Sequence, residues 1–179
     1  MSSLNISINK STLNLKNSYL DTHTWFLDYN DVKYLLWNAK YRQEFSIYNK
    51  FIKKIAIQLT DLDNVDFITN VPTSKHHITK RGFDHGEYLG RTFSKNLMLT
   101  YKNLLIPVHD IDQVHSSGDM RRKLPRYMCK KNIYNKKILI IDDIATTRTS
   151  LNRCAQALKE KGANRVDAVT IAFRHLQHY

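Results

Sequence analysis

The most constraining feature of this sequence is an unbroken apolar run that ends at two adjacent carboxylates. Residues 138–141 are all isoleucine or leucine, and Asp142 and Asp143 follow directly. A run that is apolar on both pleat faces is typical of a central parallel strand covered by helices on each side. After it, residues 151–158 carry apolar side chains at helical spacing, and Gly162 can end that helix. The stretch predicts a strand, an acidic edge, a loop and a helix in an α/β fold with a central, mostly parallel sheet.

The loop of this unit is rich in groups that can bind a sugar phosphate. Asp142 and Asp143 can accept hydrogen bonds from two neighbouring hydroxyls, and the hydroxyls that follow can donate to phosphate oxygens. These donors are Thr146, Thr147, Thr149 and Ser150. The free N–H groups and the positive dipole end of the next helix also favour an anion. A strand end or a helix cap explains any one of these residues, but six of them within nine positions favour a ligand site.

Residues 142–150 resemble the phosphoribosyl-pyrophosphate (PRPP) loop of type I phosphoribosyltransferases. The resemblance implies a catalytic pair, Asp142 and Asp143, that holds the ribose hydroxyls, a 5-phosphate site at residues 146–150, and Mg²⁺ that enters with PRPP. Arg148 stands where that family usually has glycine. If the loop needs a positive φ there, a non-glycine residue costs roughly 1–2 kcal/mol. The arginine side chain can also occupy or neutralise the phosphate pocket, so retained enzymatic function turns on Arg148.

A second anion pocket is predicted after another strand. Residues 66–71 have the pattern of a strand, and Pro72 closes it because proline cannot continue a central ladder. Residues 73–83 are expected to form a loop beside the first site, since ligands of α/β sheets bind at the carboxyl ends of the strands. The residues assigned to this pyrophosphate loop are Thr73, Ser74, Lys75 and Arg81.

Two further stretches resemble the ComF competence proteins, a phosphoribosyltransferase-like family. Residues 80–89 are similar to the Arg-Gly-Phe-Asn-Gln element of that family, and residues 36–42 are similar to its leucine-lysine-tyrosine helix end. The similarity runs through roughly residues 20–175 and implies a small N-terminal hood over the sheet. It departs at Asp84 and His85, which replace the usual Asn-Gln. No cysteine precedes Cys129, so the chain lacks the zinc ribbon of many ComF proteins and no metal site of its own is predicted.

One basic segment carries most of the formal charge of +12. Residues 120–137 hold eight cations and no acid, with tyrosines interleaved. Aromatic rings among cations suit single-stranded nucleic acid, while a solvated face, an anionic membrane surface and an acidic partner are the alternatives. The residues predicted to bind DNA are Arg121, Arg122, Lys123, Arg126, Tyr127, Lys130, Lys131 and Tyr134.

Periodicity predicts the remaining elements. Strands are expected at residues 23–29, 104–108 and 165–173, and helices at 31–39, capped by Asp31, and at 45–59. Asp84 and Glu87 have the spacing of a capping box that begins another helix. Residues 113–119 are polar and expected to be exposed.

Length and composition predict one domain with a sizeable core, because 42% of the 179 residues are hydrophobic. We expect a phosphoribosyltransferase-like domain at residues 21–179, preceded at 1–20 by an arm or an edge strand. The longest apolar stretch is far shorter than the ~20 residues of a spanning helix, and no signal-peptide pattern is present. A cytoplasmic protein is therefore predicted, with peripheral contact to the inner membrane as an option. Cys154 lies on an apolar helix face and is expected to be a buried thiol.

Three functions are compatible with these patterns. The first, implied by the ComF resemblance, is a competence protein that binds single-stranded DNA and aids its passage through the uptake machinery of the inner membrane during natural transformation. The second is a Mg²⁺-dependent transferase that moves the ribosyl-5-phosphate group from PRPP to a nucleophile. The third is a sensor of ribose phosphate or nucleotide. We rank them in this order, and the first rests on family analogy.

Overall fold

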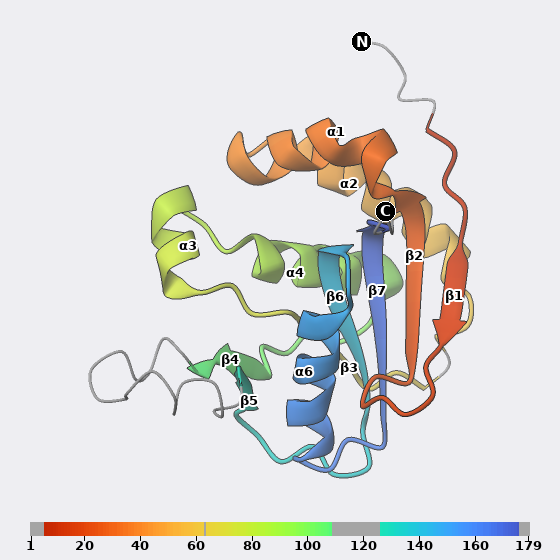
Figure 1. Cartoon of the computed structure of the whole chain (residues 1–179), viewed down its shortest axis with the longest axis vertical. Coiled ribbons are helices and arrows are strands. Elements are labelled where there is room, and N and C mark those ends of the chain that lie inside the picture. Colours follow the sequence, from red (N-terminus) through yellow and green to blue (C-terminus); the bar gives the residue numbers. More distant parts are fainter. Residues whose placement is uncertain (1–5, 63, 109–125, 176–179) are drawn as a thin grey trace.

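The fold is taken from a computed structural model, which describes residues 6–62, 64–108 and 126–175. Five strands form its main sheet. The strand order is β1-β2-β7-β6-β3, and every neighbouring pair is parallel except β1 with β2 (Figure 1). The strands are β1 (Ser11–Asn14), β2 (Thr22–Asp28), β3 (Phe67–Asn70), β6 (Lys137–Ala145) and β7 (Arg165–Phe173). A separate antiparallel pair joins β4 (Leu105–Pro107) to β5 (Tyr127–Cys129). The predicted mostly parallel sheet is confirmed.

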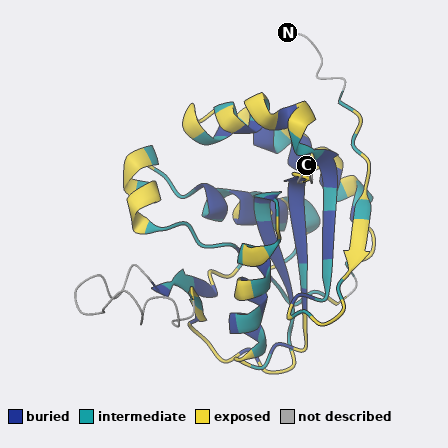
Figure 2. Cartoon of the chain, viewed as in Figure 1, coloured by how far each residue is buried: buried dark blue, intermediate teal, exposed yellow. Residues whose placement is uncertain are grey.

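Helices cover both faces of this sheet, so the predicted α/β class is confirmed as well. One face packs against α1 (Tyr29–Tyr41), α2 (Phe45–Gln58) and α4 (His85–Leu97), and the other packs against α6 (Thr149–Lys159) and the β4–β5 pair. Apart from the exposed edge strand β1, the strands of this sheet are the most buried part of the described chain (Figure 2). The carboxyl ends of β3 and β6 lie at the edge where α3 (Lys75–Arg81) projects from the body.

The central strand β6 is buried on both faces of the sheet, which explains why its sequence is apolar at successive positions. Ile138 and Ile140 belong to the core beneath α6, whereas Leu139 and Ile141 belong to the core beneath α1, α2 and α4. Each residue of the run therefore serves one of two cores, as the pleat requires. We expected the strand to stop at the end of the apolar run. Instead, it continues through both aspartates to Ala145.

Two local predictions were wrong. Residues 73–83 do not form a plain loop, because α3 occupies most of that segment. The Ser74 side chain caps its first turn, and Gly82 ends it at φ = 78°, a left-handed conformation that suits glycine. The cap of α1 is Asp28, whose carboxylate accepts from the N–H of Asn30, and not Asp31.

Helix α4 begins where the capping-box spacing predicted, with Asp84 as its N-cap, but the Glu87 carboxylate pairs with Arg91 instead of completing the box. The Asp84 carboxylate accepts a hydrogen bond of 3.1 Å from the N–H of Glu87. At the other end of the chain the thiol of Cys154 is fully buried, as expected from its place on the apolar face of α6.

The N-terminal segment adds a short strand to the edge of the sheet. β1 pairs antiparallel with β2, while Ile6 and Ile8 pack partly buried against the core. The division into an arm at 1–20 and a domain at 21–179 stays a prediction. Among the helices of the described residues, none is both long and apolar enough to cross a bilayer.

Candidate functional site

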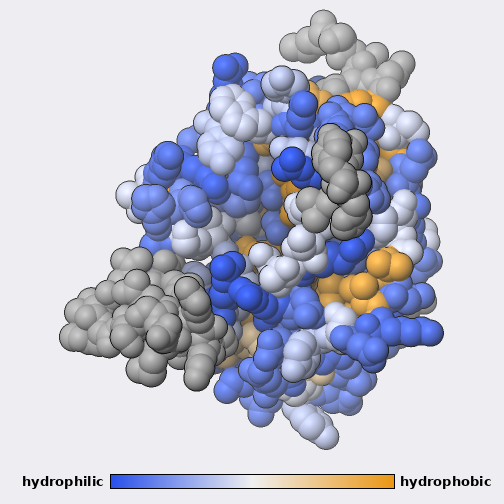
Figure 3. All heavy atoms as spheres, viewed as in Figure 1, coloured by the Kyte–Doolittle hydropathy of each residue, from blue (hydrophilic) through white to orange (hydrophobic). Residues whose placement is uncertain are grey.

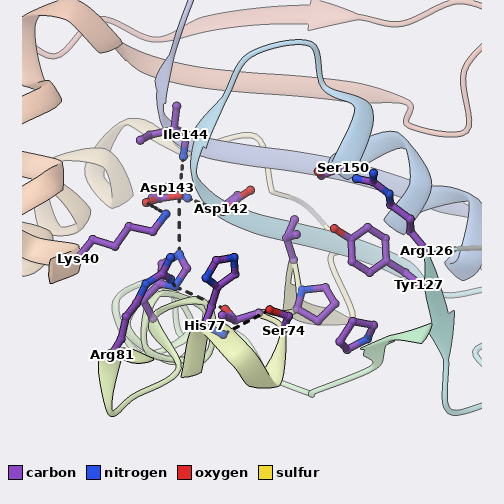
Figure 4. Close-up of a pocket in the computed structure, with 15 residues that line it drawn as sticks. Lys40, Ser74, His77, Arg81, Arg126, Tyr127, Asp142, Asp143, Ile144 and Ser150 are labelled. Carbon is purple, nitrogen blue, oxygen red and sulfur yellow. Dashed lines mark hydrogen bonds and ion pairs between the residues drawn. The ribbon is translucent and has the colours of Figure 1, made fainter. Parts of the chain in front are cut away.

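A polar cavity of about 500 Å³ opens at the carboxyl ends of β3 and β6. Side chains from α1, α3, α4, β5 and β6 converge on it, together with the loop after β3 and the first turn of α6 (Figure 4). This is the edge of an α/β sheet at which ligands are expected. The polar residues that line it are Lys40, Thr73, Ser74, His77, Arg81, His85, Arg126, Tyr127, Asp142, Asp143 and Ser150.

Asp143 faces the side of the sheet that α1, α2 and α4 cover. Its carboxylate lies 3.0 Å from the ammonium of Lys40 and accepts a 3.4 Å hydrogen bond from the Tyr48 hydroxyl. The imidazole Nε2 of His85 stands 3.9 Å away. Burial alone would raise the pKa of Asp143, but Lys40 and His85 together lower it well below its ordinary value. Asp143 is therefore a buried group whose ionised form is favoured.

Asp142 has the opposite character, although it is the next residue. The pleat turns it toward α6 and Tyr127, where its carboxylate accepts from the N–H of Asp143 at 2.9 Å. Burial and the negative charge of Asp143 raise the pKa of Asp142 well above the ordinary value. The two carboxylates are therefore not equivalent. The pKa of Asp143 is lowered, so its charged form is favoured, whereas the pKa of Asp142 is raised, so it keeps its proton to a higher pH.

These carboxylates and His85 form a group of donors that a divalent cation could use. One ligand atom from each of His85, Asp142 and Asp143 lies within 4.8 Å of the others. Mg²⁺ prefers one or two carboxylates together with water and substrate phosphates. The site fits that preference best through Asp142, because Lys40 already neutralises Asp143.

A second, smaller cavity of about 180 Å³ lies beside the first, over the turn from β6 to α6. It brings together the predicted phosphate-binding residues Thr146, Thr147, Arg148, Thr149 and Ser150. The hydroxyls of Thr147 and Thr149 are 2.8 Å apart and exposed. Asp142 and Ser150 line both cavities, so the two volumes adjoin at these residues. The N-terminus of α6 points its free N–H groups into this turn, which favours an anion.

Arg148 has a positive φ of 60°, so the loop does take the conformation that normally favours glycine. Its guanidinium does not fill the pocket. It lies 4.1 Å from the ring centre of Phe173 and 5.4 Å from that of Trp25, and Nε donates to the buried His23 at 3.0 Å. The side chain thus anchors the loop to β2 and β7 and leaves the threonine hydroxyls facing the cavity.

The loop after β3 places two of the four residues predicted for the pyrophosphate loop, Thr73 and Ser74, at the cavity. Ser74 accepts from the N–H of His77, which leaves its own O–H for a ligand, and the Thr73 hydroxyl donates to Asp84 at 2.8 Å. Lys75 is not among the residues that line the cavity. Gly86 allows α4 to approach this loop, because a Cβ there would stand 2.8 Å from the carbonyl oxygen of Val71.

Arg81, also assigned to the pyrophosphate loop, lies at the cavity and fixes the tautomer of His85. Its Nη1 donates to Nδ1 of His85 at 3.0 Å, so the proton of a neutral ring sits on Nε2, which faces Asp143.

The described members of the predicted DNA-binding set lie in different surroundings. Arg126 and Tyr127 line the cavity, whereas Lys130 binds Asn103 and the exposed Tyr134 packs near Gly162. Lys131 is exposed. Arg121, Arg122 and Lys123 lie outside the described residues, as does the polar stretch 113–119.

Sequence reasoning missed the roles of Lys40, Tyr48 and His85. Lys40 follows the apolar positions of α1 directly, so its place beside the buried face of the helix was a usable signal. A lysine at such a border needs an acidic partner when it is drawn inward. Nothing in the local sequence says that this partner is Asp143, which lies 103 residues away.

Comparison with known proteins gives one family match. A family model described as the phosphoribosyl transferase domain matches residues 45–178. None of the curated proteins compared with the chain matches it.

Solved structures share the fold. The allosteric regulatory enzyme of purine biosynthesis and the glutamine PRPP amidotransferase of B. subtilis each align with 69% of this chain at 18% identity and a TM-score of 0.50. A purine phosphoribosyltransferase of Pyrococcus horikoshii aligns with 72% of this chain at 13% identity and a TM-score of 0.46, and 81% of that protein is covered. The chain spans only about a quarter of the first two proteins, 25% and 26%.

Proposed function

Because the chain belongs to the phosphoribosyl transferase domain family, we propose that its two adjoining cavities bind PRPP with Mg²⁺ and support transfer of the ribosyl-5-phosphate group. The observation that carries this proposal is the orientation of Arg148. Its side chain turns onto Phe173 and His23, so the loop keeps a cavity lined by hydroxyls at the start of α6.

Each part of the substrate has a complementary surface. The smaller cavity, with the hydroxyls of Thr146, Thr147, Thr149 and Ser150, suits the 5-phosphate. Asp142 and Asp143 suit the ribose hydroxyls, with Asp142 the more accessible of the two. Ser74 and Arg81 line the remaining part of the larger cavity and suit the pyrophosphate.

The chemistry requires positioning and electrostatic stabilisation more than proton transfer. As the bond between the sugar and pyrophosphate breaks, positive charge develops on the ribose. Asp143, held ionised by Lys40, is an acceptor that can orient the ribose hydroxyls there, and Arg81 supplies positive charge for the leaving group. Mg²⁺, when bound with PRPP, would neutralise pyrophosphate oxygens, and Asp142 is the residue suited to hold it.

Calorimetry with PRPP and Mg²⁺ tests the proposal. We expect heat of binding at micromolar to millimolar ligand, and a large loss of affinity in the double variant Thr147→Ala, Thr149→Ala. Thr60→Ala, an exposed threonine far from the site in sequence, is the matched control. No heat at millimolar PRPP would sink the proposal. If PRPP does bind, release of pyrophosphate on addition of nucleobases separates a transferase from a sensor that binds without turnover.

A second candidate is the ComF-like role in DNA uptake. One observation favours it: Arg126 and Tyr127, at the start of the described part of the basic segment, lie at the cavity. Single-stranded DNA held by the segment would meet the pocket there. We expect oligo-dT binding that weakens steeply with salt and is reduced in the triple variant Arg121→Glu, Arg122→Glu, Lys123→Glu. Unchanged binding in that variant would leave the segment as a solvated surface. The uptake machinery as a partner, and a cytoplasmic location at the inner membrane, stay predictions.

A further inference from the structure

We propose that the outer face of α1, with α3 beside it, binds single-stranded nucleic acid by stacking its bases on exposed aromatic rings. Tyr34, Trp37 and Tyr41 stand at positions i, i+3 and i+7 and so share one face of the helix. Their side chains are 74%, 49% and 49% exposed. The opposite face of α1 buries Val32, Leu36 and Ala39, so the three rings are not required for the core. We call these three rings the aromatic stripe.

A cationic side chain lies over each ring of the aromatic stripe. Lys33 lies 5.4 Å from the ring centre of Tyr34, Arg42 lies 5.5 Å from that of Trp37, and Arg81 lies 5.1 Å from that of Tyr41. The Trp37 and Tyr41 rings are themselves 5.4 Å apart and tilted by 35°. Stacking platforms for single strands combine aromatic faces for the bases with cations for the phosphates. A partner recognised by charge alone would not use the rings.

The neighbouring α3 supplies further positive charge. Its seven residues include three cations and two histidines and no acid. The Gln43 side chain donates to the carbonyl of Arg81 at 3.2 Å and so joins the end of α1 to the end of α3. Figure 1 shows α3 beside the C-terminal end of α1, and Figure 3 shows pale side chains next to strongly hydrophilic ones over this part of the molecule. A phosphate backbone can therefore run along α3 while its bases lie over α1.

The aromatic stripe is continuous with the candidate site. Arg81 covers Tyr41 and also lines the larger cavity, and Lys40 extends from the same turn of α1 to Asp143. A strand on this face would end beside the pocket. The inference goes beyond phosphoribosyl transfer and does not depend on it, and it is argued from residues other than those of the basic segment.

Trp37 provides a direct spectroscopic test, because the chain has only two tryptophans. In the Trp25→Phe background Trp37 is the sole indole, and stacking of a base on it quenches its fluorescence. We expect saturable quenching by fifteen-nucleotide dT or rU oligomers, whose comparison distinguishes DNA from RNA, and little quenching by a duplex of equal length, since its bases are already stacked.

Binding by the otherwise unchanged chain should respond to loss of the rings. The double variant Tyr34→Ala, Trp37→Ala should bind the oligomer at least about tenfold more weakly, since one stacked base contributes roughly 5- to 150-fold. Tyr19→Ala, which removes a tyrosine that is 46% exposed outside the stripe, is the matched control and should bind as the parent does. Circular dichroism and the thermal midpoint establish that the double variant is folded, and Trp37→Leu repeats the test with an apolar side chain retained.

Three results would overturn the inference: oligomer binding without a change in Trp37 fluorescence, parental affinity in the folded double variant and in Trp37→Leu, or equal quenching by polyglutamate of the same charge. PRPP calorimetry on the double variant is expected to match the parent. Failure of the stacking surface and failure of the ribose-phosphate site are therefore distinguishable.

Discussion

Arg148 and His23, 125 residues apart, are joined by a hydrogen bond of 3.0 Å from Nε of the arginine to Nδ1 of the histidine. Because Nδ1 accepts, the ring proton sits on Nε2, which contacts the Thr170 hydroxyl at 2.9 Å. Thr170 in turn donates to the carbonyl of Ala172 at 3.1 Å. This chain of bonds fixes the tautomer of His23 and holds the turn before α6 in a conformation that an arginine backbone does not favour.

Replacing Arg148 should separate the role of its side chain from the strain of its backbone. Arg148→Ala keeps the positive φ but loses the His23 bond and the ring contacts, so we expect the free energy of unfolding to fall by about 1–3 kcal/mol. Arg148→Gly loses the same contacts but relieves roughly 1 kcal/mol of backbone strain and should fall less. Urea unfolding measures both. Equal stability of Arg148→Ala and the parent would show that the anchor contributes nothing.

His23 should make the fold sensitive to mild acid. Burial, and then the charge of Arg148, lower its pKa from 6.5 to about 3. Because the unfolded chain binds this proton near pH 6.5 and the folded chain does not, stability is full above pH 6.5 and falls as the pH drops toward 3. The slope attributable to His23 is about 1.4 kcal/mol per pH unit. Unfolding at pH 7 and pH 5 should show a smaller loss in His23→Gln than in the parent, and identical losses would contradict the assignment.

Lys40 should be important for stability as well as for the site. Lys40→Met leaves the Asp143 carboxylate buried without its nearest cation, which costs about 3–5 kcal/mol in comparable pairs. Lys54→Met, an exposed lysine on α2, is the matched control and should change stability by less than about 0.5 kcal/mol. Thermal or urea unfolding gives the comparison. If Asp143→Asn restores stability to Lys40→Met, the cost arises from the uncompensated charge.

Asp142 should give PRPP binding its pH dependence. Burial and the charge of Asp143 raise its pKa, so its carboxylate becomes a full acceptor only as the pH rises through that higher value. Affinity for PRPP with Mg²⁺ should therefore increase with pH above the range in which an ordinary aspartate titrates. Asp142→Asn should bind more weakly and lose most of this dependence. A parallel pH profile in the variant would assign the titration to another group.

Most of the fold could be predicted from local patterns. The apolar run of β6, the periodic face of α6 and the Asp84 cap of α4 are each encoded in a few adjacent residues. The short helix α3 was missed because its seven residues bury no side chain, so no apolar periodicity marks it. The position of the strand end was missed as well, since aspartates look like a terminus although the pleat continues through them.

The site was less predictable, because its decisive contacts join distant parts of the chain. The sequence around Arg148 identifies a glycine-like position but not the receptor for the side chain, which Trp25 and Phe173 build from two other strands. The ion pair of Asp143 likewise depends on how α1 crosses the end of β6. Local sequence indicates which residue types are gathered in the loop, and only the tertiary arrangement assigns them different roles.

The position of β2 has a consequence for how this domain can be divided. The family match begins at residue 45, yet β2 lies between β1 and β7, pairs in parallel with β7, and carries His23 and Trp25. A fragment that starts at residue 45 would lose Lys40 and the partners of Arg148 on β2, and it would leave the edge of β7 that pairs with β2 unpaired from Asp167 to Phe173. An unpaired edge of that kind, next to an apolar core, invites strand addition from a second molecule. The segment before residue 45 therefore also protects the sheet from edge-to-edge association.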